Sequence, residues 1–287
     1  MENNLTKALD AISQKTGIKL KLDYAEEYCN SEQHPLKKDV QKIIVAGSSV
    51  CPLCESIRNS AELSREQSEI HARTTQRQVH DFITANSLLS DKELLNAGFK
   101  NYDVADDESE AAVNKQKAIK VFKNYDAGKG FNTLLLGMPG VGKSHLAMAI
   151  LRSLNETKAG KAKCLFIKVD MLMNAIRETF NAGYAGGKNE MYYIQLLLEA
   201  DYLVLDDLGA ESGSLDRNGK ASDFVHRVLY TVLDGRQDVG TIITSNLAEE
   251  EFPDIYDTKL VSRIRKNNYL IEFINTDDKR IKSIELD

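Results

Sequence analysis

The sequence lacks any long apolar run without charges, and its first residues, MENNLTKALDAISQ, lack a basic stretch followed by an apolar segment. A membrane-spanning helix needs about 20 consecutive apolar residues, and a secretory signal needs both N-terminal features. These absences argue against membrane insertion and against secretion. With 42% hydrophobic and 28% charged residues over 287 positions, the composition predicts a soluble globular protein with one large domain and a smaller one.

Cysteines are few, and basic residues are not in excess. Three of the four cysteines lie in the first fifth of the chain, which indicates a metal site in a reducing compartment rather than a disulfide framework. We therefore expect a cytoplasmic location. The net charge of -6 argues against a broad basic surface that coats DNA, so any contact with nucleic acid is expected to be local.

The two parts of the chain differ in character. Residues 1–86 are polar and contain one expected helix, from about Glu55 to Ala85, whose narrow apolar stripe is typical of an arm or of a helix that lies on a partner. Residues 87–287 are expected to form a second domain. From Phe131 onward, short apolar runs alternate with helical stretches, which predicts an α/β fold with a parallel sheet covered by helices on both faces. The expected strands are TLLLG, CLFIKV, YLVLDD, TIITS and YLIEFI.

Residues 137–144 match the pattern G-x-x-x-x-G-K-[ST] at the point where an expected strand meets an expected helix. Glycines there let backbone N–H groups surround a β-phosphate at a helix N-terminus, where the helix dipole favours an anion. Lys143 is expected to reach the β- and γ-phosphates, and the Ser144 hydroxyl is expected to ligate Mg²⁺. The expected nucleotide contacts are Gly137, Pro139, Gly140, Val141, Gly142, Lys143, Ser144 and His145.

Polar residues also follow two other expected strands. The run Tyr202–Leu205 is followed by Asp206 and Asp207, and the carboxyl ends of parallel strands form the crevice where open α/β sheets bind ligands. We expect Asp206 to hold Mg²⁺ through water and Asp207 to orient the attacking water. Asn246 follows the run TIITS and is either a hydrogen-bond partner of the γ-phosphate or of that water, or an ordinary helix cap.

The N-terminal part contains a second constellation, with the spacing C-x4-H-x16-C-x2-C. The C-x2-C pair allows two thiolates to share one tetrahedral zinc ion, and three cysteines with one histidine complete a closed structural site. A small polar domain gains much of its stability from such a metal. His71 or His80 could replace the first histidine, and scattered thiols without a metal are the alternative. The expected ligands are Cys29, His34, Cys51 and Cys54.

The segments GMPGVGKSHLA, LVLDDLGAE, TIITSN and LVSRIRKN resemble, in order and spacing, the AAA+ ATPases of the DnaC/DnaI helicase-loader group, which includes the IstB transposition helpers. The resemblance covers roughly residues 89–273 and implies an ATPase that works between subunits. It implies that Asn246 is the polar sensor and Arg263 the arginine finger. Asp207 stands where AAA+ proteins generally have Glu, which implies slow, switch-like hydrolysis. The alternative for Arg263 is a surface charge or a pair with an acid such as Asp254 or Asp257.

The same resemblance implies partners. Helicase loaders of Gram-positive bacteria and their phages carry a zinc-bearing N-terminal domain that contacts the replicative helicase, and residues 1–86 look like a short version of it. Single-stranded DNA binds such ATPases near the segment after the second strand, here residues 170–187, with Arg177, Tyr184 and Lys188 as candidate contacts. The alternative is a core helix, because apolar residues recur there at helical spacing.

The implied function is an ATP-dependent loader that binds a ring helicase and delivers it to single-stranded DNA during replication. The implied ATP-bound state is a ring or helical homo-oligomer, and the implied cofactors are ATP, Mg²⁺ and Zn²⁺. Two alternatives remain open. One is an IstB-like transposition helper, a group that generally lacks the zinc domain. The other is a nucleotide-binding adaptor or inhibitor of a host loader or helicase.

Overall fold

The structure is a computed structural model that describes residues 23–34, 39–104, 106–182, 188–211 and 221–280. The chain divides into two compact units, residues 1–73 and residues 74–287. The cut falls inside helix α2, Pro52–His80. The domain boundary expected after residue 86 stays a prediction. None of the described helices is long and apolar enough to cross a membrane.

The first unit contains a three-stranded antiparallel sheet of order β1-β2-β3, with β1 Asp23–Cys29, β2 Val40–Val45 and β3 Ser48–Val50. Strands β2 and β3 are joined by Ala46 and Gly47, which both have a positive φ, of 49° and 82°. Such a two-residue turn matches the twist of paired strands and favours glycine. The hairpin leads directly into Cys51 and the start of α2.

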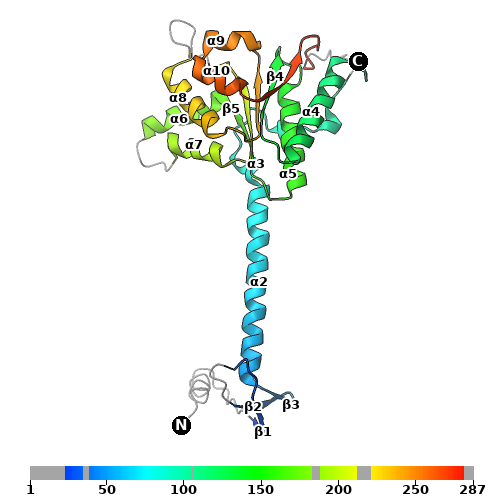
Figure 1. Cartoon of the computed structure of the whole chain (residues 1–287), viewed down its shortest axis with the longest axis vertical. Helices are drawn as coiled ribbons and strands as arrows, with labels where there is room; N and C mark the ends of the chain where they lie inside the picture. The colour runs from blue at the N-terminus through cyan, green and yellow to red at the C-terminus, as the bar shows by residue number, and fades with distance from the viewer. Residues whose placement is uncertain (1–22, 35–38, 105, 183–187, 212–220, 281–287) are drawn as a thin grey trace, which may run out of the picture. The chain divides into compact units, whose positions relative to one another are not determined.

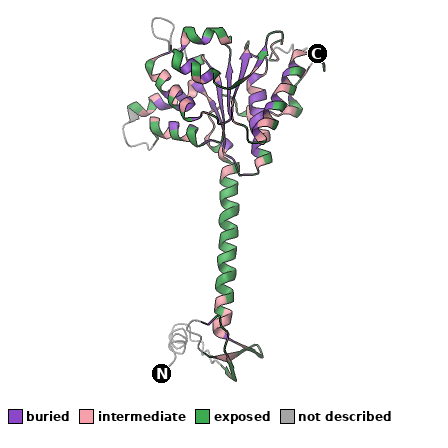
Figure 2. Ribbon diagram, viewed as in Figure 1, coloured by how far each residue is buried: buried purple, intermediate pink, exposed green. Residues whose placement is uncertain are grey.

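The single helix expected over residues 55–85 is wrong at its end. Helix α2 ends at His80, and a second helix, α3, covers Phe82–Asn86. None of the α2 residues is buried (Figure 2). Ile83 of α3, by contrast, is 4% exposed and belongs to the core of the second unit. The polar helix therefore ends where the chain begins to bury apolar side chains.

The second unit is built on a five-stranded parallel sheet of order β5-β6-β7-β4-β8. All five apolar runs that predict strands form them, so the α/β prediction is confirmed. Nearly continuous apolar runs are typical of strands that are buried on both faces. The strands are β4 Asn132–Gly137, β5 Cys164–Lys168, β6 Tyr202–Leu208, β7 Thr241–Ser245 and β8 Asn268–Phe273.

Helices cover both faces of this sheet (Figure 1). Alternate residues of β4 point to opposite faces: Leu134 and Leu136 pack with helices α6, α7 and α8, and Leu135 packs with α4 and α5. The longer helices are α4 Glu110–Asp126, α5 Lys143–Lys158, α6 Val169–Ala182, α7 Glu190–Glu199 and α8 Asp223–Gly235. The shorter ones are η2 Lys92–Asn96, η3 Phe99–Asn101, η6 Glu249–Glu251, α9 Phe252–Ile255 and α10 Thr258–Arg265.

The strand order positions the candidate site. Strand β7 lies between β4 and β6, and all three run in the same direction. Their carboxyl ends therefore lie side by side at one edge of the sheet. The phosphate loop follows β4, the two acids lie at the end of β6, and Asn246 follows β7.

Candidate functional site

The loop between β4 and α5 has a backbone that requires glycine. Gly137 and Gly142 have φ values of 146° and 98°. A Cβ atom at Gly142 would lie 2.7 Å from the ring of Tyr102, and one at Gly137 would lie 2.5 Å from the Phe273 carbonyl oxygen. Helix α5 begins directly after Gly142. The first N–H groups of α5 are therefore available to an anion in the loop.

Lys143 is 6% exposed, and its ammonium group is held by neutral oxygens. Its Nζ donates to the carbonyl oxygens of Gly137 at 2.6 Å and Met138 at 2.7 Å, and to Asn246 Oδ1 at 2.8 Å. Burial lowers the pKa of Lys143 to about 8, although the nearby acids Asp207 and Asp206 oppose the shift. A phosphate would give this ammonium a charged partner in place of neutral ones.

Asp206 is buried against hydroxyl groups. Its Oδ1 accepts a hydrogen bond from Thr244 Oγ1 at 2.7 Å, and the Ser144 hydroxyl is a second hydrogen-bond partner of the carboxylate. Burial raises the pKa of Asp206, and these hydrogen bonds oppose the shift. A carboxylate beside a hydroxyl is an oxygen donor set of the kind that Mg²⁺ prefers. The residues present therefore fit a magnesium ion.

Asp207 lies in a left-handed backbone conformation, with a φ of 62°. Its backbone N–H donates to Thr244 Oγ1 at 2.9 Å, so the Thr244 hydroxyl binds to both acids. Its carboxylate accepts from Asn246 Nδ2 at 2.8 Å and lies 3.9 Å from Lys168 Nζ. Asn246 therefore links Asp207 to Lys143 and does not cap the helix that follows.

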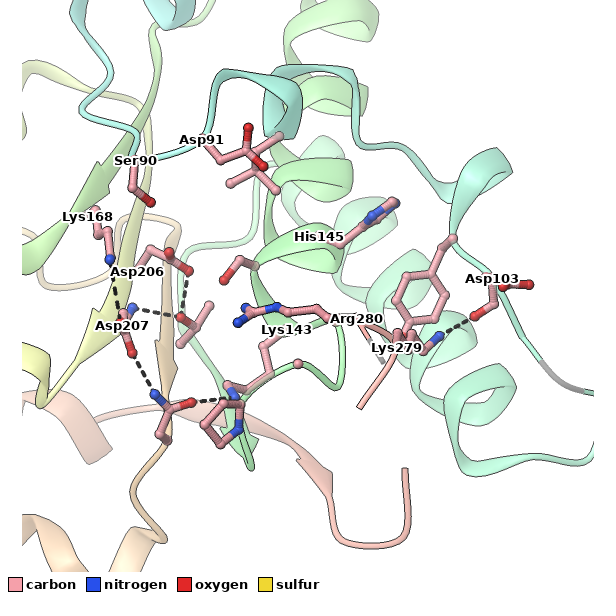
Figure 3. Close-up of a pocket in the computed structure, with 18 of the residues that line it drawn as sticks. Ser90, Asp91, Asp103, Lys143, His145, Lys168, Asp206, Asp207, Lys279 and Arg280 are labelled. Atoms are coloured by element: carbon pink, nitrogen blue, oxygen red, sulfur yellow. Dashed lines mark hydrogen bonds and ion pairs between the residues drawn. The ribbon is translucent and has the colours of Figure 1, made fainter. Parts of the chain in front are cut away.

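These groups line a pocket of about 670 Å³ (Figure 3). The structure brings Lys143, Ser144, Asp206, Asp207 and Asn246 to it, as the sequence pattern predicts. Of the other loop residues, Pro139, Gly140, Gly142 and His145 line the pocket. Val141 does not, because its side chain is 1% exposed and packs in the core. His145 Nε2 lies 3.0 Å from the carbonyl oxygen of Gly98, and burial lowers the pKa of the ring.

Several pocket residues were not identified from the sequence. Thr244 and Lys168 lie at the ends of expected strands and could have been found from that position alone. Tyr102 and Arg280 carry no motif, and they reach the pocket from segments before β4 and after β8. The Arg280 side chain points into the pocket beside Lys143, and its charge also lowers the pKa of Lys143 (Figure 3).

Arg263 does not line this pocket. Its Nε lies 2.7 Å from Asp234 Oδ1, and its guanidinium stacks over the Tyr230 ring with a distance of 5.8 Å to the centroid. The neighbouring Arg265 Nε lies 3.0 Å from Glu249 Oε1. Both arginines thus pair with acids other than Asp254 and Asp257. Helix α10 holds Arg263 away from the phosphate loop of its own chain.

The candidate DNA contacts are only partly described. Tyr184 lies outside the described residues. Arg177 Nη1 donates to Asn174 Oδ1 at 3.2 Å and lies over the Phe224 ring, and Lys188 lies over the Tyr192 ring. On α6, Leu172 and Ile176 are buried in the core, whereas Phe180 is 58% exposed. One side of α6 is therefore part of the core, as the alternative to DNA binding predicts, whereas Arg177 lies on the other side.

The first unit holds the four expected metal ligands as one cluster, Cys29, His34, Cys51 and Cys54, whose ligand atoms lie within 4.8 Å of one another. Of the three candidate histidines, His34 is the one in the cluster. The Sγ atoms of Cys29 and Cys54 are 3.8 Å apart, and His34 Nε2 lies 3.1 Å from Cys54 Sγ and 3.4 Å from Cys51 Sγ. Tetrahedral zinc with bonds of about 2.3 Å to sulfur requires sulfur atoms about 3.8 Å apart. The cluster therefore fits zinc.

Comparisons with known proteins agree with this geometry. A family model described as IstB-like ATP binding protein matches residues 61–266. The replicative helicase loader DnaC of Escherichia coli strain K12 is 29% identical over 186 residues, which cover 64% of this chain and 69% of the loader. Two solved structures have the same fold. The crystal structure of the DnaC helicase loader has a TM-score of 0.52 at 22% identity and covers 64% of this chain and 100% of that one. The crystal structure of DnaI has a TM-score of 0.51 at 24% identity and covers 65% of this chain and 96% of that one.

Replacing Lys143 should remove nucleotide binding without unfolding the protein. Lys143→Ala is expected to weaken ATP binding by at least roughly thirtyfold, because it deletes a charged hydrogen bond aimed at phosphate. The melting temperature should not fall, because the ammonium is buried among neutral partners. Titration with a fluorescent ATP analogue measures the affinity, and Lys117→Ala is the control, because this lysine lies on α4 and does not line the pocket. Unchanged affinity in Lys143→Ala would refute the assignment of the loop.

Freshly purified protein should contain about one zinc ion per chain. Cys51→Ser and Cys54→Ser should lose the metal and unfold the first unit, while ATP binding persists, because no ligand of the cluster belongs to residues 74–287. Elemental analysis and circular dichroism give the readouts. Cys164→Ala is the matched control, because this buried cysteine lies on β5, and it should keep the zinc. Wild-type protein that contains no zinc, or loss of zinc from Cys164→Ala, would contradict the assignment of the four residues as zinc ligands.

Proposed function

Because this chain belongs to the family of IstB-like ATP-binding proteins, we propose that it is an ATP-dependent loader that binds a replicative ring helicase and delivers it to single-stranded DNA. The observation that carries the proposal is one pocket that unites Lys143, Asp206, Asp207 and Asn246 in a chain similar to the DnaC loader. The first unit, with its metal cluster, then provides a surface for the helicase that is separate from the nucleotide pocket.

ATP binds with its phosphates in the loop after β4, where the N–H groups at the start of α5 and the Lys143 ammonium meet them. Ser144 and Asp206 would hold Mg²⁺, which neutralises the charge that develops on the phosphates. Asp207 orients the attacking water, and Asn246 keeps that carboxylate beside Lys143. An Asp side chain reaches less far than Glu, so turnover is slow and suits a switch.

Arg263 acts on the ATP of a neighbouring subunit. Within one chain it pairs with Asp234, at a distance from the phosphate loop, so its own nucleotide does not meet it. In the assembled state the γ-phosphate of the neighbour replaces Asp234 as its partner. Such a contact joins different surfaces of two copies, and it therefore builds a ring or an open helix rather than a two-fold dimer.

The first unit binds the helicase. Its small sheet exposes apolar side chains, including Tyr28 at 62%, Val45 at 50% and Ile44 at 44%. Ile44 and Val45 are successive residues of β2, so apolar side chains are exposed on both faces of the sheet, and a bound partner would remove them from water. The metal cluster joins Cys29 at the end of β1 to His34 and to Cys51 and Cys54 at the start of α2. The helicase-binding domain extends to residue 86 in this proposal, and the ATPase domain covers residues 87–287.

Single-stranded DNA is the second partner. Arg177 and Lys188 flank Phe224 and Tyr192, and cations beside aromatic rings suit a flexible strand with phosphates and bases. The site is local, in keeping with the net charge of -6. The protein acts in the cytoplasm, where replication takes place.

A closed circle of single-stranded DNA tests the delivery step, because a ring helicase cannot thread onto it from an end. The host helicase should co-migrate with such circles when this protein and ATP are present. Loading should be lost with Lys143→Ala and retained with Lys117→Ala. Equal loading without this protein would refute the proposal. ATP turnover without helicase binding would favour a transposition helper, and helicase binding without turnover would favour an adaptor.

Mixing two inactive variants tests the action of Arg263 on the neighbouring subunit. Arg263→Ala and Lys143→Ala should each lack ATP turnover, because trans-acting arginines contribute about 10³ to 10⁵ in rate. In a mixed assembly, an intact loop from one variant meets an intact arginine from the other, and part of the turnover should return. The measurement is phosphate release at several ratios with DNA and helicase present. If both variants assemble and no ratio restores turnover, Arg263 does not act in this way.

A further inference from the structure

A buried carboxylate follows the two acids of β6. Glu211 is 4% exposed, and both of its oxygens are used. Its Oε2 accepts from the Gly209 backbone N–H at 2.9 Å, and its Oε1 accepts from the Tyr256 hydroxyl. Gly209 is two residues beyond Asp207, and both have a positive φ, of 104° and 62°. Glu211 therefore fixes the turn that leaves Asp207, as Thr244 fixes the backbone of Asp207 itself.

The other end of this bridge lies where α9 meets α10. Tyr256 is 3% exposed, and its backbone N–H donates to the Phe252 carbonyl oxygen at 2.8 Å. The next residue, Asp257, caps α10 by accepting from the Leu260 N–H at 2.8 Å and lies 3.5 Å from His226 Nδ1. The start of α10 is thus held rigidly, and Arg263 lies on the same short helix.

The opposite end of α10 is also tied to the sheet. Asn132 Nδ2 at the start of β4 donates to the carbonyl oxygens of Arg263 at 2.9 Å and Ile264 at 3.0 Å. Helix α10 has eight residues and is bonded to neighbouring elements near both ends, so a change at either anchor alters the position of the helix. The start of α10 is connected to the Asp207 turn by the hydrogen bond from Tyr256 to Glu211 and by the one from Gly209 to Glu211.

We propose that Glu211 and Tyr256 are positioning residues that couple the Asp207 turn to α10. The nucleotide bound in one subunit then determines the position of Arg263, which acts on the nucleotide of the next subunit. This inference rests on the proposed roles of Asp207 and Arg263. A buried carboxylate and phenol cost more to desolvate than two apolar side chains of similar size. The bridge therefore supplies a defined geometry rather than stability.

The test uses the full-length protein and Tyr256→Phe, which removes the hydroxyl and keeps the ring in the core. In the wild type, a non-hydrolysable ATP analogue should slow amide hydrogen exchange both at residues 203–211 and in α10. In Tyr256→Phe the analogue should bind with equal affinity and slow exchange at residues 203–211, but the protection of α10 should be lost. The kcat for ATP should fall by about tenfold, because Arg263 on α10 is no longer positioned for the neighbouring nucleotide, while KM stays unchanged.

Tyr125→Phe is the matched control. Tyr125 is also fully buried, and its hydroxyl bonds to the Phe131 carbonyl oxygen, Thr133 Oγ1 and the Thr241 carbonyl oxygen, none of which belongs to the Asp207 turn or to α10. This variant should respond to the analogue as the wild type does, even if its melting temperature falls. Protection of α10 that persists in Tyr256→Phe, or that is lost equally in Tyr125→Phe, overturns the coupling. A wild type without ATP turnover would refute the proposed function, and the exchange data would still decide the coupling.

Discussion

The position of β7 between β4 and β6 is the constraint on which the nucleotide pocket depends. Lys143 follows the loop after β4, and Asn246 follows β7. The two residues are 103 positions apart, yet they form a hydrogen bond because β4 and β7 are neighbouring strands that end at the same edge of the sheet. Near this edge, the Thr244 hydroxyl forms hydrogen bonds with both Asp206 and Asp207 of β6. The charged groups are thus held in place by neutral partners.

The sequence predicts the large sheet well because strands buried on both faces must be apolar throughout. It also predicts the phosphate loop, because only glycine tolerates the backbone that Gly137 and Gly142 adopt. The small sheet was not predicted. Strand β1 reads DYAEEYC, and its mostly exposed residues leave no apolar pattern to detect. Helix α7 was also missed, although glycines precede it and Asn189 caps its start.

The pocket itself is predictable only where its residues belong to local patterns. Lys143 begins α5, Asp206 lies two residues before the end of β6, and Asn246 directly follows β7. Such positions can be found in the sequence. Tyr102 and Arg280 depend on contacts between distant segments: Tyr102 packs under Gly142, and Arg280 reaches the pocket after β8. The break between α2 and α3 has the same origin, because it is set by the core that Ile83 enters. Tertiary contacts of this kind leave no periodicity in the chain.

The order of elements has a consequence for biosynthesis. The four residues of the cysteine and histidine cluster lie between positions 29 and 54, so all of them emerge from the ribosome early in synthesis. Strand β8, by contrast, pairs with β4, and the two lie on opposite sides of more than a hundred residues of chain. One side of β4 therefore stays without a partner strand until residue 273 has been translated. A nascent chain therefore passes through a stage in which the complete cysteine and histidine cluster precedes an incomplete sheet with an open edge.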